Sequence, residues 1–299
     1  MPTSTANWPT PKPMPNVPNL DLLLLARQWG ATAVPFGALT PDAWLDTPQT
    51  QRARALLDQT ASLRSVMLLA GPNGVGKSAL VARWVHGLDR RLFHPLVLTH
   101  ATLSGSNLLS TLTRKLGQPA LCRRDTNLAL IESALAQLER VVPVLVLDEA
   151  QNYTHATLEE VRLLLGLNLA EPPAFALLLI GDEYLLNTLR LRHHRALYSR
   201  IGSHYSLLPW SSAQVAQYLQ QSLVAVGLQR EVFEPAALAL LTSASGGLPR
   251  SLCLLARTAW IHAASLGTQR IQPDHVQQAI DTVPAAATCA LPPASEPVS

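Results

Sequence analysis

Cysteine is scarce in this sequence, which has three in 299 residues: Cys122, Cys253 and Cys289. They lie far apart, and no two of them form a C-x-x-C pair. This odd number and wide spacing argue against a disulfide framework and against a zinc centre built on cysteine. We therefore expect a protein of a reducing compartment, the cytoplasm.

Long apolar runs and charged residues are also few. No uncharged run reaches the roughly 18–20 residues that a membrane helix needs, so we expect no membrane span. Aromatic residues make up 5% of the chain, which does not suggest base stacking on single strands. Charged residues make up 14% and hydrophobic residues 48%, so most of the chain should fold around a core. The net charge of +3 permits contact with nucleic acid but does not by itself indicate it.

The residue pattern divides the chain into four parts. Residues 1–18 contain six prolines and should form an extended, disordered arm, and the Pro/Ala/Ser-rich tail 284–299 should also be disordered. Between them, an α/β domain is expected over residues 19–209 and a small all-helical lid domain over residues 210–283. In the lid, helical patterns cover 211–226, 234–243, 248–264 and 273–280.

Strand and helix patterns alternate in the first of these domains. Strands are predicted at 65–70, 96–100, 144–147, 174–180 and 204–208, and helices at 76–88, 106–116, 126–139 and 158–167. Such alternation predicts an α/β fold, with a parallel sheet sandwiched by helices on both faces.

A phosphate-binding loop follows the first predicted strand. The sequence GPNGVGKS at 71–78 matches G-x-x-x-x-G-K-[ST] in full, between an apolar strand and a helix, as that motif requires. The loop amides would surround the phosphates, Lys77 would reach the β- and γ-phosphates, and Ser78 would ligate Mg²⁺. The predicted nucleotide-binding residues of this loop are Gly71, Pro72, Asn73, Gly74, Val75, Gly76, Lys77, Ser78 and Ala79.

The same residues also fit a dinucleotide-binding pattern, G-x-G-x-x-A at 74–79. That pattern expects an acidic residue at the end of the second strand, where it holds a ribose hydroxyl. This strand ends in Leu-Thr-His at 98–100, so the P-loop interpretation is preferred.

Two carboxylates directly follow the third predicted strand, in VLVLDEAQ at 144–151. We expect Asp148 to hold Mg²⁺ together with Ser78, and Glu149 to orient and deprotonate the attacking water. The alternative is two solvated acids that close a strand, but their position about 70 residues after a P-loop favours catalysis. The sequence therefore predicts an ATPase that depends on Mg²⁺.

With these motifs, residues 30–282 resemble the AAA+ ATPases. The resemblance implies a polar sensor residue at the end of the fourth strand, in contact with the nucleotide. Asp182 occupies that position, where the family usually carries Asn, Gln, Ser or Thr. This is a departure, because the γ-phosphate would repel a carboxylate, and Asp182 could instead turn away or simply belong to a turn.

The resemblance also implies two catalytic arginines. Arg200 corresponds to the finger that reaches a neighbouring subunit's nucleotide, which implies a homo-oligomer, and Arg250 in Gly-x-Pro-Arg corresponds to the lid's sensor arginine. The alternatives are a solvated basic helix face and an ordinary solvated arginine. His193 and His194 lie in the same basic stretch, but no further ligand at a suitable spacing supports a metal site there.

Further motifs resemble one branch of these ATPases, which includes ExeA/GspA-type proteins and the transposition ATPases TniB and TnsC. They are WGATAVPFG at 29–37, LLP at 207–209 and the Gly-x-Pro-Arg turn. We favour a helper ATPase that assembles with ATP on double-stranded DNA and presents a target site to a transposase. The chain ends soon after the lid, whereas secretion-type relatives typically continue into a membrane segment. The alternatives are a secretion-associated ATPase, an ATP-switched scaffold and, less favoured, a replication-initiator-like loader.

Four basic residues are candidate DNA contacts: Arg114, Lys115, Arg123 and Arg124. The first two would end one helix, and the others lie in the loop that follows. The alternative is a solvated helix end, where basic groups are favourable in any case.

Overall fold

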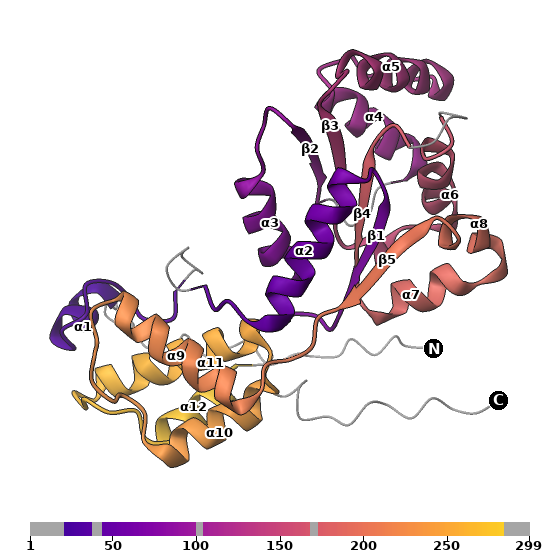
Figure 1. Cartoon of the computed structure of the whole chain (residues 1–299). Coiled ribbons are helices and arrows are strands. Elements are labelled where there is room, and N and C mark those ends of the chain that lie inside the picture. The colour runs from indigo at the N-terminus through magenta and orange to yellow at the C-terminus, as the bar shows by residue number, and fades with distance from the viewer. Residues whose placement is uncertain (1–20, 38–43, 100–103, 168–172, 284–299) are drawn as a thin grey trace, which may run out of the picture.

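The computed structural model describes residues 21–37, 44–99, 104–167 and 173–283. An α/β domain and a helical domain lie side by side, as Figure 1 shows. The predicted arm at 1–18, the predicted tail at 284–299 and the last residue of the strand predicted at 96–100 lie outside the described residues.

The α/β domain is built on a parallel sheet in the order β2-β3-β4-β1-β5, in which every described strand pair is parallel. Leu68 in β1, which lies between β4 and β5, pairs with Leu179 on one side and with His204 on the other. The predicted parallel sheet is thereby confirmed. Its strands are β1 (Val66–Ala70), β2 (Phe93–Leu98), β3 (Val142–Leu147), β4 (Ala176–Ile180) and β5 (Ile201–Ser206).

Helices cover both faces of this sheet, because successive side chains of a strand point to opposite faces. In β1, Met67 and Leu69 pack with the helices of one face, and Val66 and Leu68 pack with those of the other. The first face is covered by α2 (Pro48–Ser62) and α3 (Lys77–Gly87). The second is covered by α4 (Gly105–Lys115), α5 (Arg124–Gln137), α6 (His155–Leu164), α7 (Glu183–Arg190) and α8 (Arg195–Tyr198).

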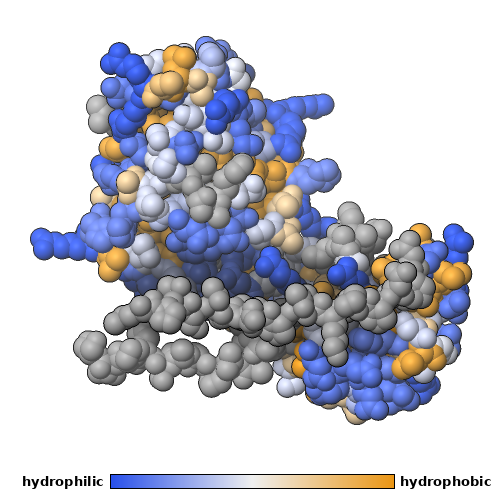
Figure 2. Space-filling view, turned by 180° about the vertical axis from the view of Figure 1, so that it is seen from behind, coloured by the Kyte–Doolittle hydropathy of each residue, from blue (hydrophilic) through white to orange (hydrophobic). Residues whose placement is uncertain are grey.

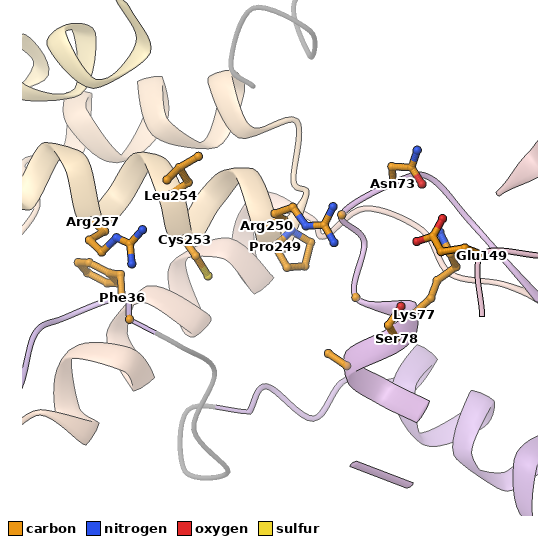
Figure 3. Close-up of a pocket in the computed structure, with 14 residues that line it drawn as sticks. Phe36, Asn73, Lys77, Ser78, Glu149, Pro249, Arg250, Cys253, Leu254 and Arg257 are labelled. Atoms are coloured by element: carbon orange, nitrogen blue, oxygen red, sulfur yellow. The ribbon is translucent and has the colours of Figure 1, made fainter. Parts of the chain in front are cut away.

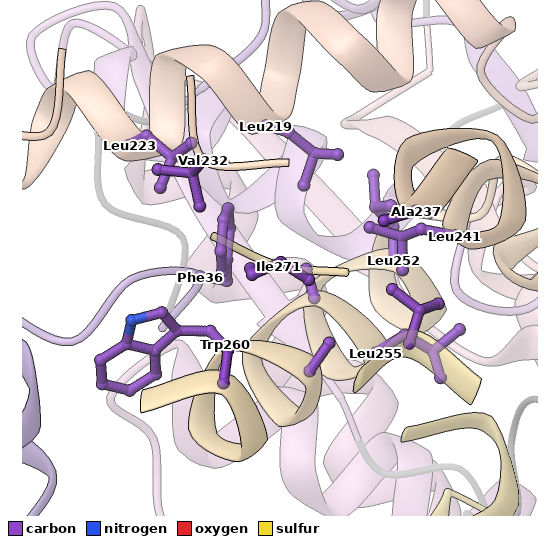
Figure 4. Close-up of a cluster of buried hydrophobic side chains, with 14 of the residues drawn as sticks. Phe36, Leu219, Leu223, Val232, Ala237, Leu241, Leu252, Leu255, Trp260 and Ile271 are labelled. Atoms are coloured by element: carbon purple, nitrogen blue, oxygen red, sulfur yellow. The ribbon is translucent and has the colours of Figure 1, made fainter. Parts of the chain in front are cut away.

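Helices α9 (Ser212–Ala225), α10 (Pro235–Ser245), α11 (Pro249–Ser265) and α12 (Pro273–Thr282) form most of the helical domain. Ser211 caps α9 through a reciprocal capping box with Gln214, as its position in the sequence predicts. The three later helices each begin with proline, whose missing N–H costs nothing in a first turn. Their apolar faces pack together in one core, which includes the fully buried Trp260 (Figure 4).

An N-terminal segment packs with this helical domain rather than with the sheet. Helix α1 (Leu22–Gln28) and the residues after it bury Ala26, Trp29 and Phe36 in the helical core. The Trp29 ring meets Trp260 edge-on at 6.1 Å between centroids, and Phe36 lies 5.8 Å from Phe233. The expected α/β domain began at residue 19, whereas these apolar side chains find their partners in the helical domain.

Helices α1 and α2 are not among the elements predicted from the sequence. Helix α2 begins with a capping box in which Thr47 and Thr50 exchange hydrogen bonds. The usual box has Glu or Gln at the later position, so the signal is weak in the sequence.

Among the described residues, no helix combines the length and hydropathy needed to span a bilayer. Hydrophilic residues dominate the face that Figure 2 shows.

Candidate nucleotide site

The loop between β1 and α3 depends on glycine. Gly71, Gly74 and Gly76 have φ angles of +145°, +84° and +103°, which side-chain-bearing residues rarely adopt. A Cβ on Gly71 would lie 2.6 Å from the carbonyl oxygen of Leu207. The expected sequence of strand, glycine loop and helix is therefore present. The first amides of a helix have no partner within it, so the N-terminus of α3 can donate to an anion at the loop.

Lys77 lies in the first turn of α3 and is 8% exposed. Its Nζ donates hydrogen bonds to the carbonyl oxygens of Gly71 (2.6 Å) and Pro72 (3.1 Å). Burial lowers the pKa of Lys77 from its ordinary value, and nearby carboxylates, Glu149 first among them, oppose that shift. In this arrangement the loop carbonyls accept the hydrogen bonds of the Lys77 amine, and phosphate oxygens can replace them as acceptors.

The two carboxylates after β3 differ in their contacts. Asp148 accepts a hydrogen bond from the amide of Glu149 through Oδ1 (2.9 Å). Glu149 has a left-handed φ of +53°, and its Oε2 accepts a hydrogen bond from Nε2 of Gln151 (2.6 Å). Gln151 therefore orients the carboxylate predicted to act as the base. Sequence analysis did not single out this residue, although it stands two positions after Glu149.

Asp182 follows β4 and caps α7. Its Oδ1 accepts hydrogen bonds from the amides of Tyr184 (2.9 Å) and Leu185 (3.2 Å). The carboxylate is close enough to influence the pKa of Lys77, but it does not line the cavity described next. These contacts make Asp182 the cap of α7. A sensor role for Asp182 stays a prediction from the resemblance.

A cavity of about 470 Å³ separates the phosphate loop from α11. Figure 3 shows Lys77, Ser78 and Glu149 at one end of it, with Arg250 between them and the helical domain. The amide of Arg250 donates a hydrogen bond to the carbonyl of Gly74 (3.1 Å), which ties the lid directly to the loop. This volume lies within the range of typical small-molecule sites, roughly 300–1,000 Å³.

The other end of this cavity contains residues that sequence analysis did not assign to the site. Cys253, Leu254 and Arg257 lie on α11, and Phe36 reaches the cavity from the N-terminal segment. Phe36 has a left-handed φ of +55° and is 3% exposed. The positions 250, 253, 254 and 257 follow the spacing of one helix face, a signal that could have identified them once Arg250 was placed.

The structure does not bring Arg200 into this cavity. Arg200 is exposed at the start of β5, and its Nη1 donates a hydrogen bond to the carbonyl of Arg162 in α6 (3.0 Å). Of the two predicted catalytic arginines, only Arg250 lines the site within the same chain.

The candidate DNA-contacting residues are collected where α4 ends and α5 begins. Arg124 is engaged in a bidentate ion pair with Glu160, through Nε–Oε1 at 2.8 Å and Nη2–Oε2 at 2.9 Å. Within the described ranges, no ion pair is formed by Arg114, Lys115 or Arg123. The charge of Arg124 is therefore offset, and these three remain the better candidates.

Residues 59–189 match the model of a family described as an AAA domain. Over 128 residues the chain is 37% identical to general secretion pathway protein A of Aeromonas hydrophila. That match covers 43% of this chain and 23% of the relative, so it spans about a quarter of the relative's length.

Solved structures of Cdc6p and ORC proteins are similar over most of the chain. The Cdc6p protein of Pyrobaculum aerophilum superposes with a TM-score of 0.66 at 18% identity, over 86% of this chain and 73% of that one. The ORC2 protein of Aeropyrum pernix, in ADPNP-ADP complexes, gives 0.60 at 19% identity over 89% and 74%. The ORC1 protein of Aeropyrum pernix, in complex with DNA, gives 0.61 at 18% identity over 81% and 67%.

These similarities agree with the parallel sheet, its flanking helices and the helical domain that follows them. The chain matches an AAA domain in its central part and is similar both to general secretion pathway protein A and to ORC and Cdc6p proteins. It has the P-loop AAA+ fold, with a helical domain after the sheet.

Proposed function

We propose that this protein binds ATP with Mg²⁺ in the cavity between the phosphate loop and α11, and hydrolyses it. The observation that carries the proposal is the convergence of Lys77, Ser78, Glu149 and Arg250 on this one cavity, from two domains. The family match supports nucleotide chemistry, and the ORC2 structure described above is a complex with nucleotides.

The residues present fit a magnesium ion. Ser78 lines the cavity, and among the described residues no hydrogen bond is donated to Oδ2 of Asp148. Hydroxyl and carboxylate oxygens are ligands that Mg²⁺ prefers in proteins. Bound there, the ion would neutralise charge on the phosphates, while Lys77 exchanges its carbonyl partners for phosphate oxygens.

Glu149 is the base in this proposal. Its carboxylate lines the cavity and is oriented by Gln151, so it can accept a proton from a water directed at the γ-phosphate. Arg250 would stabilise the charge that develops on the phosphates. The backbone amide of Arg250 is hydrogen-bonded to the phosphate loop. A shift of Arg250 when nucleotide binds would therefore also move α11 and the helical domain.

We further propose that Arg200 acts on the nucleotide of a neighbouring chain, since it is exposed and does not line the cavity of its own chain. Arg200→Ala should bind ATP normally but hydrolyse it slowly, by roughly 10³-fold or more for a transition-state arginine. Mixing it with Glu149→Gln chains, which retain Arg200, should restore turnover in the Arg200→Ala sites. A mixture no faster than its components would exclude the trans role, and Arg140→Ala provides a matched exposed control.

For the cellular role of the protein, we propose only a class of process. The GspA relative favours a secretion-associated ATPase, and the ORC1 structure in complex with DNA supports assembly on DNA. Neither the family description nor the relatives named above refer to transposition, so the transposase partner remains a prediction from the sequence. The ATP-switched scaffold remains a further candidate.

The rate of ATP hydrolysis with and without double-stranded DNA separates these candidates. If the chain works on DNA, duplex should stimulate hydrolysis at low salt, and the stimulation should fade as salt rises because phosphate contacts release counterions. Replacing Lys115 and Arg123 by alanine should weaken the stimulation without lowering the basal rate. A rate indifferent to DNA at every salt concentration would favour the secretion-associated or scaffold function.

A further inference from the structure

Three histidines meet on the α/β domain, on the face opposite α2 and α3. His155 is the first residue of α6, and His193 and His194 belong to the short 3-10 helix η3 (Arg192–His194). One ring nitrogen from each lies within 4.8 Å of the others. We call this group the histidine cluster. In the sequence, His193 and His194 follow His155 by 38 and 39 residues.

Both contacts of hydrogen-bond length within the histidine cluster involve one atom, Nδ1 of His155. Nδ1 of His155 lies 2.7 Å from Nε2 of His194 and 3.0 Å from Nε2 of His193. Only one proton can lie between two neutral ring nitrogens, so hydrogen bonds join these three atoms through at most two shared protons. A cation at their common focus would instead contact all three lone pairs.

The surrounding fold holds this geometry in place. Thr154 caps α6 and fixes the start of the helix at His155. His194 is 3% exposed, and Leu189 and Leu197 on either side of η3 are buried in the core of the α/β domain. His155 and His193 are exposed, so solvent ions can reach the cluster.

Burial and the neighbouring rings of His193 and His155 lower the pKa of His194, while Glu159 opposes the shift. Glu159 itself is bonded to Arg162 through Oε1, at 2.6 Å and 2.8 Å, so it is already engaged.

We propose that His155, His193 and His194 form a three-histidine site for a divalent transition metal ion of the zinc type. Three imidazoles are a common ligand set for Zn²⁺ and leave a fourth position to water. Borderline ions such as Zn²⁺, Co²⁺ and Ni²⁺ suit imidazole, whereas Mg²⁺ prefers oxygen. The ion would fasten η3 to α6 and so hold the beginning of the basic stretch that leads to Arg200.

The test is a Zn²⁺ titration by calorimetry of the full chain, without a histidine tag and after treatment with a chelator. Excess Mg²⁺ and no nucleotide are present, so that carboxylates do not take up Zn²⁺. We expect one ion per chain. His193→Gln and His155→Gln should each lower the affinity by roughly 100-fold or more, beyond the 10–100-fold loss seen for outer-sphere partners. His86→Gln, an exposed histidine on α3, should leave it unchanged.

A second readout does not depend on activity and guards against misfolding. Zn²⁺ should raise the melting temperature of the wild-type protein and of His86→Gln, but not that of His193→Gln, because a ligand that binds only the folded chain stabilises it. Circular dichroism without metal should show that both cluster variants are folded. Absence of Zn²⁺ uptake by the wild-type chain, or uptake that survives both substitutions, would overturn the proposal while leaving the nucleotide site unaffected.

Discussion

Replacing Lys77 by alanine is expected to lower the affinity for ATP by roughly 100-fold or more. The buried amine of Lys77 makes two hydrogen bonds to loop carbonyls, which phosphate oxygens would replace. Charge-assisted hydrogen bonds contribute about 1.5–3 kcal/mol each, and every 1.4 kcal/mol is tenfold in affinity. Equilibrium binding of a fluorescent ATP analogue, displaced by ATP, measures the effect.

Lys115→Ala is the matched control for this variant. It removes the same charge from an exposed position at the end of α4, which does not line the cavity. Its affinity for ATP should equal that of the wild-type protein. If Lys77→Ala also retained wild-type affinity while folded, the assignment of this loop to phosphate binding would have to be abandoned.

Replacing Glu149 by glutamine is expected to slow hydrolysis by roughly 10²–10⁴-fold, the contribution of a positioned general base. An amide has nearly the same shape as a carboxylate but cannot accept the proton of the attacking water. Nucleotide binding should persist, because Lys77 and the loop amides are unchanged. Single-turnover hydrolysis of radiolabelled ATP measures the chemical step, and a filter assay measures the nucleotide retained.

The control for this second variant is Glu132→Gln, an identical chemical change on the exposed side of α5. It should hydrolyse ATP at the wild-type rate. Turnover of Glu149→Gln at that same rate would assign the base to another group. An equal loss of nucleotide binding in Glu149→Gln would instead indicate that this carboxylate supports the loop rather than the reaction.

Local patterns predicted much of the α/β domain. The strand cores at 66–70, 144–147 and 176–180 are apolar on both faces, as a strand between two layers of helices must be. A run of four or five consecutive apolar residues is enough to recognise them in the sequence. The edge strand β5 lies at Ile201–Ser206 rather than at the predicted 204–208. It pairs with β1 on one side only, and its side chains alternate in exposure. An alternating polar strand carries a weaker hydrophobic signal than a buried one.

The phosphate loop and the Asp148–Glu149 pair were recognisable because their chemistry lies in consecutive residues. Phe36, Cys253 and Arg257 were not assigned to the site, since their role depends on where α1 and α11 pack. The same limit applies to Asp182, whose sequence position suggests a sensor but whose side chain is taken up in capping α7.

By itself, the sequence determined the strand–helix alternation of the α/β domain, the glycine loop and the two carboxylates that follow β3. These features rest on contacts between residues close in the chain, where backbone geometry and periodicity decide the outcome. Only the tertiary structure joined the N-terminal segment to the helical domain, closed a cavity between Lys77 and Arg250, and set His155 beside His193 and His194. Such pairings depend on which apolar faces bury one another, and that is decided by the packing of the whole chain.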